Sequence, residues 1–121
     1  MQSAAQAYGS IAKQVASPRE LESDLLLKAA SRLQIVLDGW DATKPQLDAA
    51  LLYNRKLWTI FISSVTSDDN PLPAEIRQNV ANIGVFVLHQ TIAMLANPRP
   101  EQISGLISIN RELASGLRGR A

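Results

Sequence analysis

The stretch LYNRKLWTIFISSVTSDDNPLP, Leu52 to Pro73, combines an apolar seam with a turn marked by prolines. The seam begins just before this stretch, and its residues recur at spacings of four and three: Leu47, Leu51, Asn54, Trp58, Phe61 and Val65. This spacing places side chains on one face of an α-helix. The second half, SSVTSDDNPLP, is rich in the residues that form turns. The stretch therefore predicts a long core helix, then a turn that starts another helix.

Similar breaks recur along the chain at Ser17-Pro18, Thr43-Lys44-Pro45, Asn70 to Pro73 and Asn97 to Pro100. Proline is favoured in the first turn of a helix, where its missing N–H would have no intrahelical partner. Three hydroxyl residues also have the spacing of a capping box, in the pairs Ser3 with Gln6, Ser17 with Glu20, and Thr43 with Gln46. Five helices are predicted, at 3–15, 18–39, 44–67, 73–96 and 100–117.

No segment shows the alternation of period two that predicts a strand. We therefore expect an all-α fold, a compact antiparallel bundle of about five helices. The chain of 121 residues is long enough for one core, so a single domain over residues 1–121 is expected, with 118–121 as a frayed tail. No signal-peptide pattern or cysteine is present, which fits the cytoplasm.

The composition disfavours catalysis and nucleic-acid binding. The chain has no Cys and one His, and it has 12 basic against 11 acidic side chains without a long run of either sign. The single histidine, His89, is expected to be structural, and Asp68 and Asp69 are expected to serve a turn and not a cation. We therefore predict no enzyme activity, metal or cofactor, and direct nucleic-acid binding is unfavoured without a basic face.

Residues 78–98 contain no Lys, Arg, Asp or Glu. Seven polar side chains in this window favour a buried helix over a membrane span, for which about 20 predominantly apolar residues are needed. The predicted helix at 73–96 has two apolar faces. One comprises Ile76, Val80, Ile83, Val87 and Met94, and the other comprises Val85, Leu88, Ile92 and Leu95. A helix with two apolar faces is either central or has a second partner.

Asn54 is the polar member of the seam, and Arg55 lies at the edge of the seam. A buried amide without partners costs about 1–3 kcal/mol. Asn54 is therefore expected either to bond backbone inside the bundle or to face a groove that a partner closes. For Trp58 and Phe61 two interpretations stay open, the core or the rim of such a groove.

These residues resemble a known family. The segments SPRELE (Ser17 to Glu22), NRKLWTIF (Asn54 to Phe61) and NPLP (Asn70 to Pro73) are similar to the flagellar biosynthesis regulator FlaF of alphaproteobacteria, and the resemblance runs from about Ala7 to Met94. It implies a small cytoplasmic protein without enzyme activity or cofactor. Such a protein would promote flagellin production after transcription, opposite to the repressor FlbT, and would engage flagellin before export.

An apolar groove in a helical bundle can bind an amphipathic helix such as a flagellin terminus. The candidate partner-binding residues are Asn54, Arg55, Trp58, Phe61, Val85, Leu88, Ile92 and Leu95. The alternative is a regulator that binds flagellin mRNA directly, which would need a basic patch with exposed aromatic rings.

Overall fold

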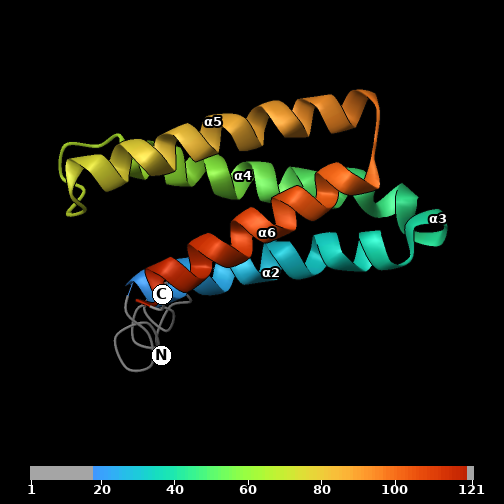
Figure 1. Ribbon diagram of the computed structural model, residues 1–121, viewed down its shortest axis with the longest axis horizontal. Helices are drawn as coiled ribbons and strands as arrows, with labels where there is room; N and C mark the ends of the chain where they lie inside the picture. The colour runs from blue at the N-terminus through green and yellow to red at the C-terminus, as the bar shows by residue number, and fades with distance from the viewer. Residues whose placement is uncertain (1–17, 120–121) are drawn as a thin grey trace, which may run out of the picture.

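Proline and turn residues set most helix ends in the computed structural model, which describes residues 18–119 (Figure 1). The elements are α2 (Pro18–Asp38), α3 (Trp40–Thr43), the 3₁₀ helix η1 (Lys44–Gln46), α4 (Leu47–Val65), α5 (Ala74–Ala96) and α6 (Pro100–Leu117). The all-α class is confirmed. In the described range the predicted count of about five becomes four long helices and a short helical corner. The predicted helix at 3–15 lies outside that range.

The corner between α2 and α4 differs from the prediction of one helix starting at residue 44. Thr43 was expected to cap that helix with Gln46, but its hydroxyl donates to carbonyl oxygens behind it, at 2.8 Å to Val36 and 2.9 Å to Gly39. Threonine bonds of this kind compete with capping. The hydroxyl therefore extends the end of α2 into α3, and α4 begins only at Leu47.

In the turn between α4 and α5, Asn70 makes the bonds to the backbone. Its Nδ2 donates to the Ser64 carbonyl oxygen at 3.1 Å, and its Oδ1 accepts the Leu72 N–H at 3.0 Å. Asp69 accepts a bond from the neighbouring Ser67 hydroxyl. These bonds satisfy groups that the end of α4 leaves unpaired, so the turn places the start of α5 beside α4.

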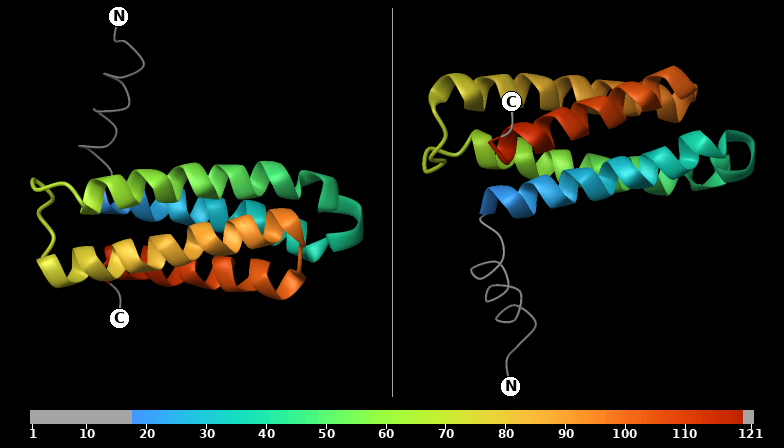
Figure 2. Two further views of the ribbon diagram at one scale, coloured as in Figure 1. Left: turned by 90° about the horizontal axis from the view of Figure 1, so that it is seen from above. Right: turned by 60° about the horizontal axis from the view of Figure 1, so that its bottom comes forward.

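The four long helices form two antiparallel pairs, α2 with α6 and α4 with α5, and α2 also packs on α4 (Figures 1 and 2). In contrast, α5 and α6 contact each other only sparsely. They meet near the short connection between them and diverge toward the other end of the bundle, where α2 begins (Figure 2). The bundle is therefore open along the α5–α6 side.

The core lies between α2, α4 and α6 and continues to α5. Its largest fully buried apolar side chains are Leu26, Leu33, Val36, Leu51, Trp58, Val87, Met94, Ile103 and Leu106. The rings of Trp58 and Phe61 meet edge to face, with centroids 5.7 Å apart. At Gly84, the missing side chain lets α5 approach α4. A Cβ there would lie 2.5 Å from Ile62 Cγ1 and 3.4 Å from Trp58 Cε3.

A chain of buried amides joins α2, α4 and α6 inside this core. Trp58 Nε1 donates to Asn110 Oδ1 at 2.9 Å, and Asn110 Nδ2 donates to Asn54 Oδ1 at 2.7 Å. A longer bond of 3.4 Å runs from Asn110 Nδ2 to the Leu26 carbonyl oxygen. Asn54 Nδ2 has no hydrogen-bond partner among the described residues. Because any shift of the helices would leave further buried donors and acceptors unpaired, these bonds fix how the three helices face one another.

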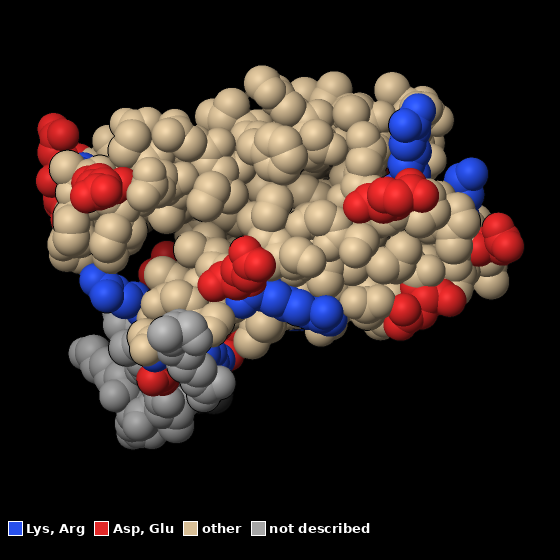
Figure 3. Space-filling model, viewed as in Figure 1, with Lys and Arg blue, Asp and Glu red and all other residues tan. Residues whose placement is uncertain are grey.

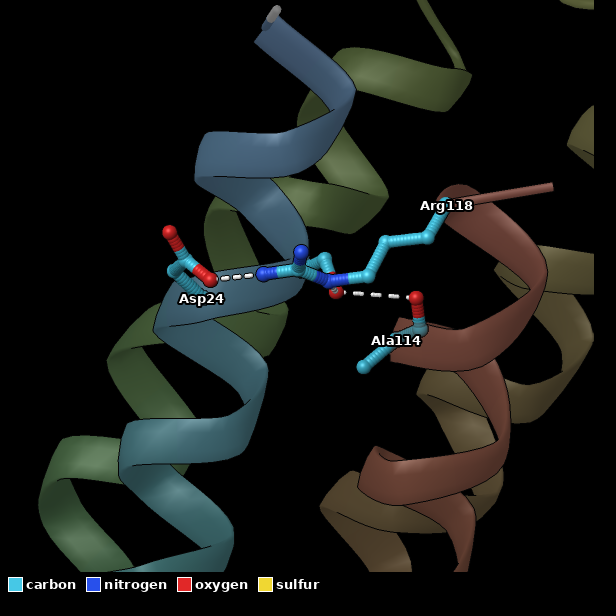
Figure 4. Close-up of polar contacts among 4 residues, drawn as sticks. Asp24, Ala114 and Arg118 are labelled. Atoms are coloured by element: carbon cyan, nitrogen blue, oxygen red, sulfur yellow. Dashed lines mark hydrogen bonds and ion pairs between the residues drawn. The ribbon is translucent and has the colours of Figure 1, made fainter. Parts of the chain in front are cut away.

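A second polar cluster joins α2 to the end of α6 (Figure 4). The buried Ser23 hydroxyl donates to the Ala114 carbonyl oxygen at 2.8 Å, and Arg118 Nε donates to Ser23 Oγ at 2.8 Å. Arg118 also pairs with Asp24. Arg118, expected to begin the frayed tail, is thus held against α2. Beside this cluster, burial raises the pKa of the Glu22 carboxyl, and the positive charge of Arg19 partly opposes the shift.

Candidate functional site

The structure divides the eight candidate binding residues between the core and the surface. Asn54, Trp58 and Phe61 are buried on the inner face of α4, whereas Arg55 is exposed. For the two aromatic residues, the core interpretation therefore holds within the chain. Asn54 lies in neither of its two expected environments. Its side chain accepts a hydrogen bond from the Asn110 amide on α6, so it neither bonds backbone nor faces a surface groove.

The other four candidates, Val85, Leu88, Ile92 and Leu95, form a stripe along α5. Each follows a buried residue of the inward stripe by one position, and that inward stripe includes Gly84, Val87, Thr91 and Met94. One position rotates a side chain by about 100° around a helix. The four residues therefore share a flank beside the core face, which we call the outer stripe. Val85 is 48% exposed, Ile92 64% and Leu95 48%, whereas Leu88 is half-buried.

The opposite flank of α5 faces α6 across an open cleft. Ile83 and Phe86 precede Gly84 and Val87 by one position, and they line a cleft of about 580 Å³ together with Ile109 and other residues of α6. The complete lining is Asn82, Ile83, Phe86, Ile109, Glu112 and Leu113. In Figure 3 the surface is hollowed between the diverging ends of α5 and α6.

A smaller cleft of about 260 Å³ also lies between α5 and α6, and Phe86 lines both. Its other lining residues are Gln90, Glu101, Gln102, Gly105 and Leu106. We call the two clefts together the α5–α6 groove. Phe86 is 51% exposed although it is a large aromatic residue. About half of its surface therefore remains exposed beside the two clefts.

Sequence reasoning did not find this groove. It grouped Ile83 on one face with Val80, Val87 and Met94, but these three are buried whereas Ile83 is exposed beside the cleft, and it gave Phe86 no role. One signal was available, because Phe86 is the only aromatic residue in the uncharged window and lies three positions after Ile83, on the same side of a helix. What the sequence does not contain is the divergence of α5 from α6, which turns that side into a groove.

The surface of α5 is uncharged along most of its length. On the face shown in Figure 3, the half formed by α5 is tan, and charged side chains lie along the other half and at the ends. By length and composition α5 would suffice to cross a membrane, and 28% of its most apolar window is buried in the bundle. The expectation of a buried helix therefore holds for one stripe of α5, while both flanks and His89 are exposed.

Basic side chains of α2 cover the one tyrosine of the described range. Arg32 lies over the ring of Tyr53 with its guanidinium carbon 4.4 Å from the centroid, and Lys28 Nζ lies 5.8 Å from the same point. Such cation–π contacts use the ring face that a stacked base would need. Within residues 18–119, no group of three or more His, Cys, Asp or Glu side chains could hold a metal ion.

The fold and these surfaces define a class, a small helical-bundle protein with two exposed apolar surfaces along α5, a helix that carries no charge after Arg77. A family model for the flagellar protein FlaF matches residues 4–117. The chain therefore belongs to the FlaF family of flagellar proteins. No curated protein and no solved structure matches it significantly.

Proposed function

We propose that this chain is a non-enzymatic, cytoplasmic regulator of flagellum biogenesis that promotes flagellin production after transcription. It does so by binding flagellin before export, as a chaperone-like partner, and it acts opposite to a FlbT-type repressor. The observation that carries this proposal is the outer stripe of α5. Its apolar side chains repeat along the helix, and three of the four are exposed beside the face of α5 that joins the core.

The spacing of the outer stripe fits a helical partner. Val85, Leu88, Ile92 and Leu95 recur at spacings of three, four and three, which gives a straight apolar row over about three turns of helix. An amphipathic helix binds through anchors with this same repeat. Exposed rows of this kind mark interaction sites in soluble proteins. Because the row carries no charge, a partner can cover it without desolvating an ion.

The experiment is co-purification of the protein with full-length flagellin and with flagellin that lacks either or both terminal helices. Ile92→Glu in the outer stripe should weaken flagellin binding by about tenfold or more, because it buries a charge at the centre of the contact. Ile60→Glu on α4 is a matched control, since Ile60 is 65% exposed and Ile92 is 64% exposed. The control should bind flagellin as the unchanged protein does.

Three outcomes would contradict this proposal. Recovery of flagellin that is unchanged when both terminal helices are removed would exclude a helix-binding site. Equal loss with Ile60→Glu and Ile92→Glu would mean that the outer stripe is not the site. Direct binding to flagellin mRNA, with an affinity that falls steeply as salt rises, would favour the RNA-binding alternative.

A further inference from the structure

The α5–α6 groove is a second apolar surface, separate from the outer stripe, and the described residues leave it open. Ile83 and Phe86 line it from α5, and Ile109 and Leu113 line it from α6. Phe86 lies at the junction of the two clefts, since it lines both. A groove between two helices that is lined in this way can bind the apolar face of a third helix.

The charged side chains in the groove lining are all acidic. Glu101 lines the smaller cleft and Glu112 the larger one. The two residues are about three turns, or about 16 Å, apart along α6, so both project from the same side of that helix. Both are exposed, and neither forms an ion pair within residues 18–119. Arg99 and Arg111, the arginines nearest to them in the sequence, do not line the clefts. The rim of the groove therefore favours positive charge.

We propose that the α5–α6 groove binds an amphipathic helix of a partner protein that carries basic side chains about three turns apart at the edge of its apolar face. The apolar face covers Phe86 and Ile109, and the basic side chains pair with Glu101 and Glu112. Lys and Arg suit this edge, because their stems lie along apolar surface while their charged ends reach the carboxylates. This site is separate from the outer stripe and does not depend on the function proposed for it.

A second copy of this chain fits the groove less well than a basic partner. In a dimer with two-fold symmetry the same surface faces itself, so the acidic rim of one copy meets the acidic rim of the other. With the axis through Phe86 and across the groove, Glu112 of one copy approaches Glu101 of the other. Like charges across an interface oppose association, whereas these carboxylates attract a basic helix.

Gln102 adds a polar anchor next to Glu101. Its Oε1 is buried and has no hydrogen-bond partner among residues 18–119, although buried polar groups in folded proteins usually have one. Gln102 lines the smaller cleft. A rotation of its side chain would bring the oxygen into that cleft, where an N–H donor of the partner helix would satisfy it. The basic side chain that pairs with Glu101 can supply this donor.

Two synthetic helical peptides of about 18 residues, a length at which isolated helices begin to be stable, test the groove in the full-length protein. Both peptides carry the same row of leucines at helical spacing, and they differ only in the residues that flank this row, which are Lys in one and Glu in the other. At low salt the Lys peptide should bind about tenfold more tightly, and the difference should shrink as salt rises. Fluorescence anisotropy of labelled peptides measures both affinities.

Two sets of variants locate the bound peptide. Phe86→Ala should weaken binding of the Lys peptide by about tenfold, because it removes the aromatic anchor. Ile92→Ala, on the opposite flank of α5 and 64% exposed, should leave the affinity unchanged. Glu101→Lys combined with Glu112→Lys should reverse the preference between the two peptides. Circular dichroism shows whether each variant keeps the helical fold.

The control for the reversal is Asp48→Lys combined with Asp68→Lys, which makes the same change in net charge at exposed positions outside the groove. It should preserve the preference for the Lys peptide. Equal affinities for the two peptides, or no binding of either, would overturn the proposal. Equal losses with Phe86→Ala and Ile92→Ala would overturn it as well. A dimer in sedimentation that Phe86→Ala abolishes would assign the groove to a second copy, and would also overturn it.

Discussion

The α2–α6 pair and the α4–α5 pair are held together by different chemistry. Ser23, Asn110 and Arg118 give the first pair buried and half-buried hydrogen bonds between helices. The second pair packs mainly through apolar side chains around Gly84. Hydrogen bonds in a core favour a single arrangement of the helices, because any shift leaves a donor or acceptor unpaired. Apolar contacts do not restrict the arrangement in this way, and α5 keeps several large apolar side chains exposed beside its contact with α4.

The largest expected effect concerns Trp58, which joins α4 to the polar α2–α6 pair through its bond to Asn110. Trp58→Ala removes a fully buried ring and the donor to Asn110 Oδ1, and should destabilise the fold by about 3–5 kcal/mol. Trp58→Phe keeps a ring but leaves Asn110 Oδ1 without this donor, and should cost about 1–3 kcal/mol. Urea unfolding followed by circular dichroism measures both. Trp40→Ala, at the half-buried corner, is the control.

A smaller loss for Trp58→Ala than for Trp40→Ala would contradict the assignment of Trp58 to the core. If Trp58→Phe costs nothing, the amide chain does not hold the helices in place. Either result would also reopen the interpretation of Trp58 as part of a binding groove.

The intermediate effect concerns the close apolar contact between α5 and α4 at Gly84. Gly84→Ala places a methyl group against Ile62, which should cost about 1–3 kcal/mol in overpacking and return up to about 1 kcal/mol in helix propensity. A net loss of about 1–2 kcal/mol is expected. Gly105→Ala in α6 is the matched control, since a Cβ there meets nothing within 4 Å. It should stabilise the protein by about 0.5–1 kcal/mol.

Thermal melts of the two alanine variants measure this difference. Stabilisation by both substitutions would mean that α5 is not held close to α4 at Gly84. The apolar pair would then be looser than the structure describes.

The smallest effect concerns the pH dependence of the α2–α6 end. Burial raises the pKa of Glu22 in the folded state above its ordinary value of 4.5. The folded protein therefore binds this proton more tightly than the unfolded chain does, and stability falls as the pH rises from that ordinary value through the raised one. Glu22→Gln should unfold at slightly higher urea than the unchanged protein at pH 7, and the difference should vanish near pH 4.

Urea midpoints at several pH values between 4 and 7 measure this effect. The exposed Glu112→Gln makes the same change in net charge and serves as the control. A midpoint for Glu22→Gln at pH 7 that is lower than that of the unchanged protein would show that the carboxylate is favourable where it lies.

Much of the fold could be predicted because prolines mark helix starts locally. The predicted helices at 73–96 and 100–117 match α5 and α6 within one residue, and 18–39 matches α2 equally well. The error at residue 44 arose because Thr43 bonds backward to α2. Whether Thr43 bonds backward to α2 or caps the next helix depends on the local backbone geometry, which the residue type alone does not determine.

The candidate surfaces were less predictable. The sequence predicted the outer stripe, because the spacing and polarity of its side chains can be read from a single helix. The partner of Asn54 could not be found in this way, since Asn110 lies 56 positions away and nothing local connects them. The α5–α6 groove depends on the angle between two helices. Sequence spacing alone does not give that angle.

The bond between Ser23 and Ala114 spans 91 positions of sequence and has a consequence for the order of folding. During synthesis α2 emerges first, yet the helix that covers it most extensively is α6. Until residue 114 has left the ribosome, Leu26 and Leu33 lack part of their final cover. Closing the bundle therefore requires a contact between segments that are far apart in the sequence, and contacts of this kind slow folding.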